Sequence, residues 1–187
     1  IQSFTTKNAD DYAVDLGLSV MWASCDLGTD DPFEDGIPFA WGSVVPNKQG
    51  TLDAYEHYVN GEYVDLGTNI SGTEYDAARE YWGGKWRMPT REEVEEFYNH
   101  CTYEEKYIES EDLAYFIWNS PSKKTITIKS FVPYKCDETY SSRNAIPERW
   151  TATLTDDAVY AYATYFFKSV KKSKRKRELC IRPVCDY

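Results

Sequence analysis

The amino-acid sequence predicts an α+β fold, with helices early in the chain and an antiparallel sheet late in it. Two segments with helix-capping signals lie between residues 71 and 101. Strand-like runs follow, and the turn TDD separates two of them as in a β-hairpin. Helices grouped apart from antiparallel strands are typical of the α+β class.

The first predicted helix lies within the segment SGTEYDAAREYW. We expect it to begin at Ser71 or Thr73, because Ser71 followed by Glu74 fits a capping box. Gly83 and Gly84 should end it, because glycine readily adopts the left-handed backbone of a C-terminal cap.

The second predicted helix begins at Thr90, in the segment TREEVEEFYNHC. Thr90 and Glu93 form a capping box, and the acidic first turn suits the positive end of the helix dipole. The apolar residues of this segment recur at helical spacing and predict one buried stripe opposite an acidic face. The stripe consists of Val94, Phe97, Tyr98 and Cys101.

Short strands are expected before these helices and longer ones after them. Tyr12–Ser24 predicts a strand pair or a bulged strand around Gly17, Ile37–Gly42 a short buried strand, and residues 47–72 a long irregular segment. In Ala158–Phe167 both faces are apolar, which predicts a central strand. The other late strands are expected at Leu113–Trp118, Lys124–Tyr134, Arg149–Leu154 and Leu179–Cys185.

Length and composition indicate one globular domain. The chain has 187 residues, 42% of them hydrophobic, and we divide it into a flexible segment 1–11 and a domain 12–187. No apolar run approaches the roughly 20 residues of a membrane-spanning helix. The first residue is Ile1 and not Met, which indicates a removed signal peptide or a trimmed N-terminus.

The net charge of −10 disfavours nucleic acid as a partner, because most of the surface would repel phosphates. The run KSVKKSKRKRE at residues 168–178 nevertheless holds seven of the 21 basic residues and one acid. It is either a solvated hairpin tip or an electrostatic docking patch. The sequence favours the solvated tip.

No catalytic motif is present, so we expect a non-enzymatic protein without a cofactor. Phosphate-loop, GxSxG, HExxH and CxxC patterns are all absent, and His57 and His100 are the only histidines. The acidic turn TDDPFEDG could hold Ca²⁺ through oxygen ligands, although the EF-hand spacing is missing and an exposed turn is the alternative. Its carboxylates are Asp30, Asp31, Glu34 and Asp35.

Several segments together resemble the Fibrobacter succinogenes major paralogous domain family, over about Tyr12 to Val184. They are YAVDLGLSVMWASCDLG, EDGIPFAWGSVVP, YDAAREYWGGKWRMPTREEVEEFYNHCTY, WTATLTDDAVYAYATYFF and CIRPV. The resemblance implies a C-type-lectin-like fold, with two helices packed on a twisted antiparallel sheet and long loops. It also implies a protein secreted by a bacterium or held at its outer surface, with a lipid anchor upstream of Ile1 as one option.

The family resemblance implies a ligand-binding module for an extracellular protein or glycan. The alternatives are a structural or adhesive part of a surface assembly, such as a fimbrial tip, and a copper-dependent oxidase of the formylglycine-generating type. The oxidase would use Cys180 and Cys185, which an extended strand would hold about 16–17 Å apart, too far to share a metal. The implied ligand-binding residues are Trp150, Tyr160, Tyr162, Lys171, Lys172, Lys174, Arg175, Lys176 and Arg177.

The cysteine count is five, so at least one thiol has no partner within the chain. Cys25 and Cys101 stand where the family often carries cysteine. The resemblance therefore leaves two alternatives for this pair, a disulfide bridge or two buried thiols.

The segment WGGKWRMPT is the most specific part of the resemblance, and we interpret it as the joint between the two helices. The tryptophans should pack this joint, and Arg87 should bind a carbonyl or carboxylate there. Trp86 and Arg87 are expected to be largely buried. The signature residues are Trp82, Gly83, Gly84, Trp86, Arg87, Pro89 and Thr90.

Overall fold

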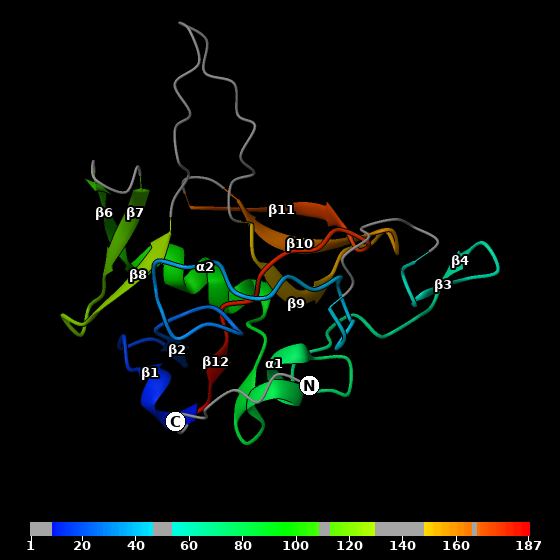
Figure 1. Ribbon diagram of the computed structural model, residues 1–187, viewed down its shortest axis with the longest axis horizontal. Helices are drawn as coiled ribbons and strands as arrows, with labels where there is room; N and C mark the ends of the chain where they lie inside the picture. Colours follow the sequence, from blue (N-terminus) through cyan, green and yellow to red (C-terminus); the bar gives the residue numbers. More distant parts are fainter. Residues whose placement is uncertain (1–8, 47–53, 109–112, 130–147, 166–167) are drawn as a thin grey trace, which may run out of the picture.

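The protein is a mixed α/β chain of small antiparallel sheets, seen here in a computed structural model that describes residues 9–46, 54–108, 113–129, 148–165 and 168–187 (Figure 1). The α+β class is therefore confirmed. The predicted flexible segment lies mostly outside the described residues, and its last part enters the 3-10 helix η1 at Ala9–Tyr12. No helix of the described residues is long and apolar enough to cross a bilayer.

One sheet joins the beginning and the end of the chain, with strand order β1-β2-β12-β5. Its antiparallel strands are β1 (Ala13–Val14), β2 (Met21–Ala23), β12 (Val184–Cys185) and β5 (Trp86–Arg87). The strand pair predicted within Tyr12–Ser24 is confirmed as β1 and β2. The last strand lies between β2 and β5, so the C-terminal strand connects the N-terminal strands to β5.

A second sheet has the order β11-β10-β9 and is built from β9 (Trp150–Leu154), β10 (Tyr160–Tyr165) and β11 (Ser169–Lys174). The hairpin around TDD and the central place of β10 are both confirmed. The basic run, however, was expected as a solvated tip, and most of it is strand β11. Its backbone pairs with all of β10 from Tyr160 to Tyr165, and this pairing makes it a strand despite its polar side chains.

The remaining strands lie at the two sides of the molecule (Figure 1). One sheet consists of β6 (Thr102–Ile108), β7 (Leu113–Asn119) and β8 (Thr125–Lys129), and β6 was not expected from the sequence. The predicted strand after Lys124 is described as β8 up to Lys129, and the rest of the predicted range lies outside the described residues. The segment 47–72 contains the hairpin of β3 (Tyr58–Val59) and β4 (Glu62–Tyr63), whereas Ile37–Gly42 contributes only a bridge from Phe39 to Leu179.

Helix α1 covers Ala77–Trp82 and begins later than its sequence predicted. Asp76 is the N-cap, and its carboxylate accepts the backbone N–H groups of Ala78 and Arg79 at 2.9 and 3.2 Å. The predicted start at Ser71 or Thr73 is wrong, because the Ser71 hydroxyl donates instead to the carbonyl of Met88. Gly83 ends the helix with a φ of 64°, as expected.

Helix α2 covers Arg91–His100 and has the predicted capping box of Thr90 and Glu93. Val94 and Phe97 are buried on its inner side, and Cys101 is buried just after its end. The helix packs against the sheet of β9, β10 and β11. The small residues Ala161 and Ala163 of β10 belong to the main core cluster with Trp41, whereas Val94 and Phe97 of α2 belong to a second buried cluster.

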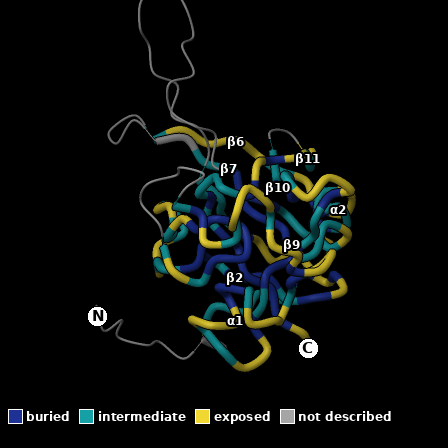
Figure 2. The backbone as a smooth tube through the Cα atoms, turned by 90° about the vertical axis from the view of Figure 1, so that its right-hand side faces the viewer, coloured by how far each residue is buried: buried dark blue, intermediate teal, exposed yellow. Residues whose placement is uncertain are grey.

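The buried backbone lies at the centre of the molecule, while the exposed segments surround it (Figure 2). The carboxylate of Asp26 is fully buried there. Asp26 accepts hydrogen bonds from Arg149 Nη2 at 2.7 Å and from Arg182 Nε at 2.6 Å, and both arginines are buried as well. This ion triad ties the loop after β2 to β9 and to the segment before β12.

Candidate ligand-binding surface

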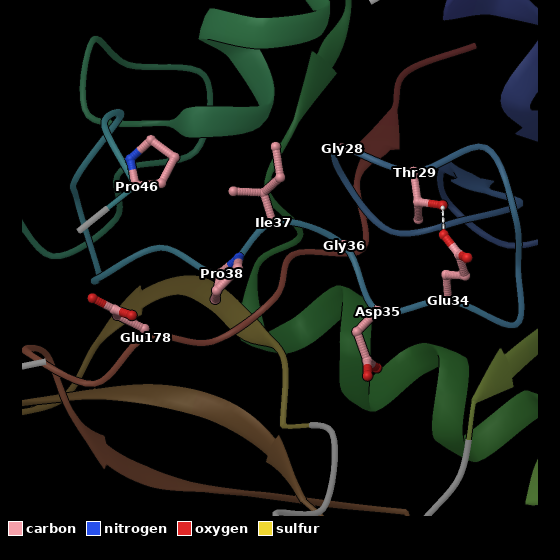
Figure 3. A pocket seen from close by; sticks show the side chains of 9 residues that line it. All are labelled: Gly28, Thr29, Glu34, Asp35, Gly36, Ile37, Pro38, Pro46 and Glu178. Carbon is pink, nitrogen blue, oxygen red and sulfur yellow. Dashed lines mark hydrogen bonds between the residues drawn. The ribbon is translucent and has the colours of Figure 1, made fainter. Parts of the chain in front are cut away.

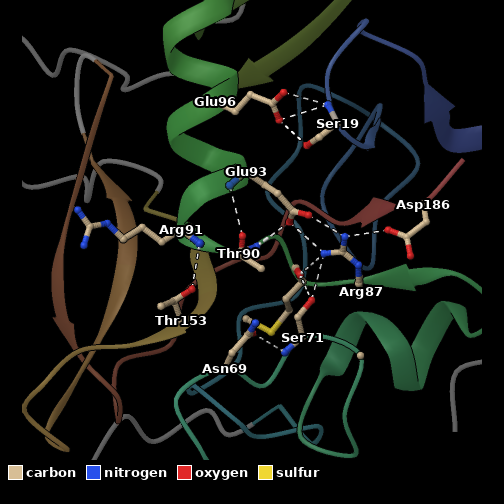
Figure 4. Close-up of polar contacts among 12 residues, drawn as sticks. Ser19, Asn69, Ser71, Arg87, Thr90, Arg91, Glu93, Glu96, Thr153 and Asp186 are labelled. Atoms are coloured by element: carbon tan, nitrogen blue, oxygen red, sulfur yellow. Dashed lines mark hydrogen bonds and ion pairs between the residues drawn. The ribbon is translucent and has the colours of Figure 1, made fainter.

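The signature segment WGGKWRMPT is a structural joint, as the sequence predicted (Figure 4). Trp86 is 2% exposed, and its ring contacts that of Trp82 with centroids 4.8 Å apart. Arg87 is partly buried; its guanidinium donates to Glu93 at 2.7 and 2.9 Å and to Asp186 at 2.8 Å. The hydrogen bonds with Glu93 raise the pKa of Arg87 above its ordinary value, so this cation is held within the fold.

Trp150 was expected to contact a ligand, and the structure corrects this. Its side chain is 0% exposed and its Nε1 donates to the carbonyl of Phe39 at 2.8 Å. A tryptophan in this place supports the sheet from inside the core. It therefore cannot touch a ligand at the surface.

Arg175 was also expected to contact a ligand and is buried as well, with 1% exposure. Its guanidinium lies 4.8 Å from the ring centroid of Trp41, and Nε donates to the hydroxyl of Tyr55 at 3.0 Å. Two further hydrogen bonds reach the carbonyls of Val64 and Ala158. Because its donors and its flat faces are used inside the protein, Arg175 is a structural cation.

Three more members of the predicted basic patch differ in how they are held. The Lys171 amine lies over the ring of Tyr165. Arg177 donates to Glu148 at 2.7 Å and is therefore neutralised by it. Lys176 is partly exposed, in the turn that follows β11.

The other predicted residues come together on one face of β10 and β11. Tyr160 lies opposite Lys174 and Tyr162 lies opposite Lys172, and residues directly opposite each other share a face. Both lysines are exposed and both tyrosines are partly exposed. Arg91, from the first turn of α2, lies 4.4 Å above the ring of Tyr162. We call these five residues the tyrosine–lysine face.

Sequence reasoning missed Arg91 as part of this surface, because its position depends on how α2 packs against β10. A hollow of about 510 Å³ lies between the start of α2 and the turn that joins β9 to β10. The Arg91 backbone N–H donates to the hydroxyl of Thr153 at the wall of the hollow (Figure 4). The hollow is lined by Thr68, Asn69, Glu92, Thr153, Leu154, Thr155, Asp156 and Ala158.

A second hollow of about 280 Å³ lies near the acidic turn that was considered for calcium (Figure 3). Within the turn, Asp31 accepts the backbone N–H of Phe33 at 2.8 Å, and Asp35 pairs with Lys129 at 2.9 Å. Across the described residues, His, Cys, Asp and Glu side chains do not gather in any group of three that could hold a metal. The described turn therefore does not gather Asp30, Asp31, Glu34 and Asp35 into a calcium site, and of the two alternatives its contacts favour the exposed turn.

The cysteines settle the choice between a bridge and two thiols. Cys25 and Cys101 are both buried and free, so of the two alternatives the structure has the two buried thiols. The Cys25 thiol donates to the carbonyl of Thr29 at 3.0 Å, while Cys101 packs in the cluster of Phe97. Burial raises the pKa of each thiol to about 11, so both are protonated at neutral pH.

We compared the chain with protein-family models, with curated proteins and with solved structures, and no match was found in any of the three. The candidate surface therefore rests on its own contacts. Tyrosine offers a large contact area at a low entropic cost, and lysine adds positive charge and three donors. Such a surface can bind a ligand without performing chemistry on it.

Proposed function

We propose that this chain is a non-enzymatic ligand-binding module with a C-type-lectin-like fold, in a protein secreted by a bacterium or held at its surface. Two observations support this fold: the two helices beside antiparallel sheets, and the sequence segments that carry the family resemblance. The ligand is an extracellular protein or glycan.

The register of β10 and β11 is the observation that carries this proposal. It pairs Tyr160 with Lys174 and Tyr162 with Lys172 on one face, in a chain whose net charge is −10. The core is filled from the opposite face by Ala161 and Ala163, so the exposed lysines beside the tyrosines are not needed to fill it. Recognition of a ligand explains both residue types.

Protein and glycan arrays probed with the wild-type chain test the proposal. The variant Lys172→Ala/Lys174→Ala should lose the wild-type hits, whereas Lys123→Ala/Lys124→Ala should keep them. The second pair is a matched control, because Lys123 and Lys124 are exposed in the turn between β7 and β8. Equal binding by both variants, or no array hit at all, would contradict the proposal. Association of the chain with itself alone would favour a structural part such as a fimbrial tip.

A further inference from the structure

Strand β11 has one edge that β10 does not cover. In the described part of the chain, β10 is the only strand paired with β11, and β11 forms the outer strand of its sheet (Figure 1). In an outer strand about half of the backbone N–H and C=O groups point away from the sheet. These groups are a template for one more strand.

The charge of β11 determines which strand can pair there. The sequence SVKKSK contains three lysines and no acid. A second copy of β11 would bring like charges opposite each other, which destabilises a strand pair. The lysines of this edge strand therefore oppose pairing with a second copy of β11. An acidic strand would instead be attracted to them.

The side chains of β11 also have a suitable spacing. Lys172 and Lys174 lie two residues apart on the exposed face, roughly 6.6–6.8 Å along the strand. An extended peptide with acidic residues at every second position has the same repeat and places its carboxylates beside these lysines. Its backbone alternates donors and acceptors in register with β11, which a glycan does not.

We propose that the edge of β11 that faces away from β10 binds an acidic, extended segment of an extracellular protein as a further strand of the sheet. Backbone hydrogen bonds supply the affinity, and Lys172 and Lys174 select the acidic sequence. This inference rests on the proposed function and names the partner class of the same surface. The face of Tyr160 and Tyr162 then lies one strand further in, where it can contact long side chains of the added strand.

The test uses the full chain and a capped, fluorescent peptide in which glutamate alternates with valine. Fluorescence anisotropy should show binding that weakens with added salt. Two further forms of the peptide, each N-methylated on one edge only, keep every charge. The form that lacks the N–H donors facing β11 should lose binding, and the other form should keep it. Lys172→Gln/Lys174→Gln should weaken binding about tenfold, because each exposed ion pair contributes little. Lys123→Gln/Lys124→Gln should leave it unchanged.

Each other outcome has a definite meaning. If both edge-methylated forms of the peptide bind as well as the plain one, the contact is electrostatic only and strand addition is overturned. If a polyuronate binds at Lys172 and Lys174 while the peptide does not, the ligand is a glycan; the inference fails and the proposed function stands. If neither probe binds and the arrays are also empty, both fail. Circular dichroism of each variant establishes that it remains folded.

Discussion

The basic residues of this protein fall into two groups that differ in surroundings and in role. Arg149, Arg182 and Arg175 are buried, and all three are held by carboxylates, carbonyls or aromatic rings. Lys172 and Lys174 are exposed on β11. Lys174 directly precedes the buried Arg175 in the chain. Arginine suits the interior because its flat, forked guanidinium can satisfy several partners at once. Charge therefore has a structural use inside this chain, and the recognition that we propose falls on its exposed lysines.

The largest expected effect comes from the buried ion triad. Asp26→Asn should lower the free energy of unfolding by about 4 kcal/mol, because two buried guanidinium groups lose their counter-charge. The asparagine amide would also place its N–H donor opposite a guanidinium donor, and two donors cannot form a hydrogen bond with each other. Urea unfolding followed by fluorescence measures the change. Asp35→Asn removes an exposed pair with Lys129 and should cost less than about 1 kcal/mol; equal losses in the two variants would break the distinction between buried and exposed pairs.

Arg175 and its neighbour Lys174 give the sharpest contrast within one run. Arg175→Met should cost about 3 kcal/mol, since the hydroxyl of Tyr55 and the carbonyl of Val64 lose their buried donor. Lys174→Met should stay within about 0.5 kcal/mol, because its side chain is exposed. Thermal and urea unfolding of both variants should agree. If Arg175→Met were as stable as the wild type, Arg175 would contribute no more to stability than the exposed lysines do.

The pH dependence of stability should follow the inner group. Burial alone would raise the pKa of Asp26, but the charges of Arg149 and Arg182 outweigh burial and hold the pKa below its ordinary value. Since the folded pKa is the lower one, ionised Asp26 stabilises the fold above its unfolded pKa of about 3.9, and this contribution disappears as the pH falls through the folded pKa. Unfolding free energies measured across acidic pH should show this slope in the wild type. The slope should be reduced in Asp26→Asn, and an unchanged slope would assign the acid sensitivity to other carboxylates.

The helix cap should contribute less to stability than the buried charged groups do. Thr90→Ala should cost about 1 kcal/mol, because the Glu93 N–H loses its side-chain acceptor. Thr90→Ser keeps that acceptor and should stay close to the wild type. Peptide and array binding at β11 should be unchanged in both variants once the protein is folded. If folded Thr90→Ala lost binding, the joint between the two helices would take part in recognition. The distinction between structural charges inside and recognition charges outside would then fail.

The sequence predicted those elements whose signals are local. Thr90 and Glu93 lie within one turn, so the capping box of α2 was visible in the letters and is confirmed. The start of α1 was not, because Asp76 competes for the cap through contacts that include the backbone N–H groups of Gly72 and Met88. Strand β11 was missed for a related reason. Its lysine-rich sequence has no apolar alternation, and only pairing with β10 makes it a strand.

The candidate surface was predicted in part. The family resemblance implied Tyr160, Tyr162, Lys172 and Lys174 as ligand-binding residues, and the register of β10 and β11 places these four on one face. Trp150 and Arg175 were chosen wrongly, since residue type alone does not say which side of a strand or turn is covered. Arg91 belongs to a different segment and carried no sequence signal.

By itself, the sequence determined the α+β class, the second helix with its cap, the hairpin after β9 and the structural role of the joint around Trp86. Each depends on neighbours in the chain or on a short periodic pattern. Only the tertiary structure decided which cations are buried, that Cys25 and Cys101 remain thiols, and that Arg91 covers Tyr162. These features depend on contacts between segments distant along the chain, where packing and the cost of burying a charge select the arrangement.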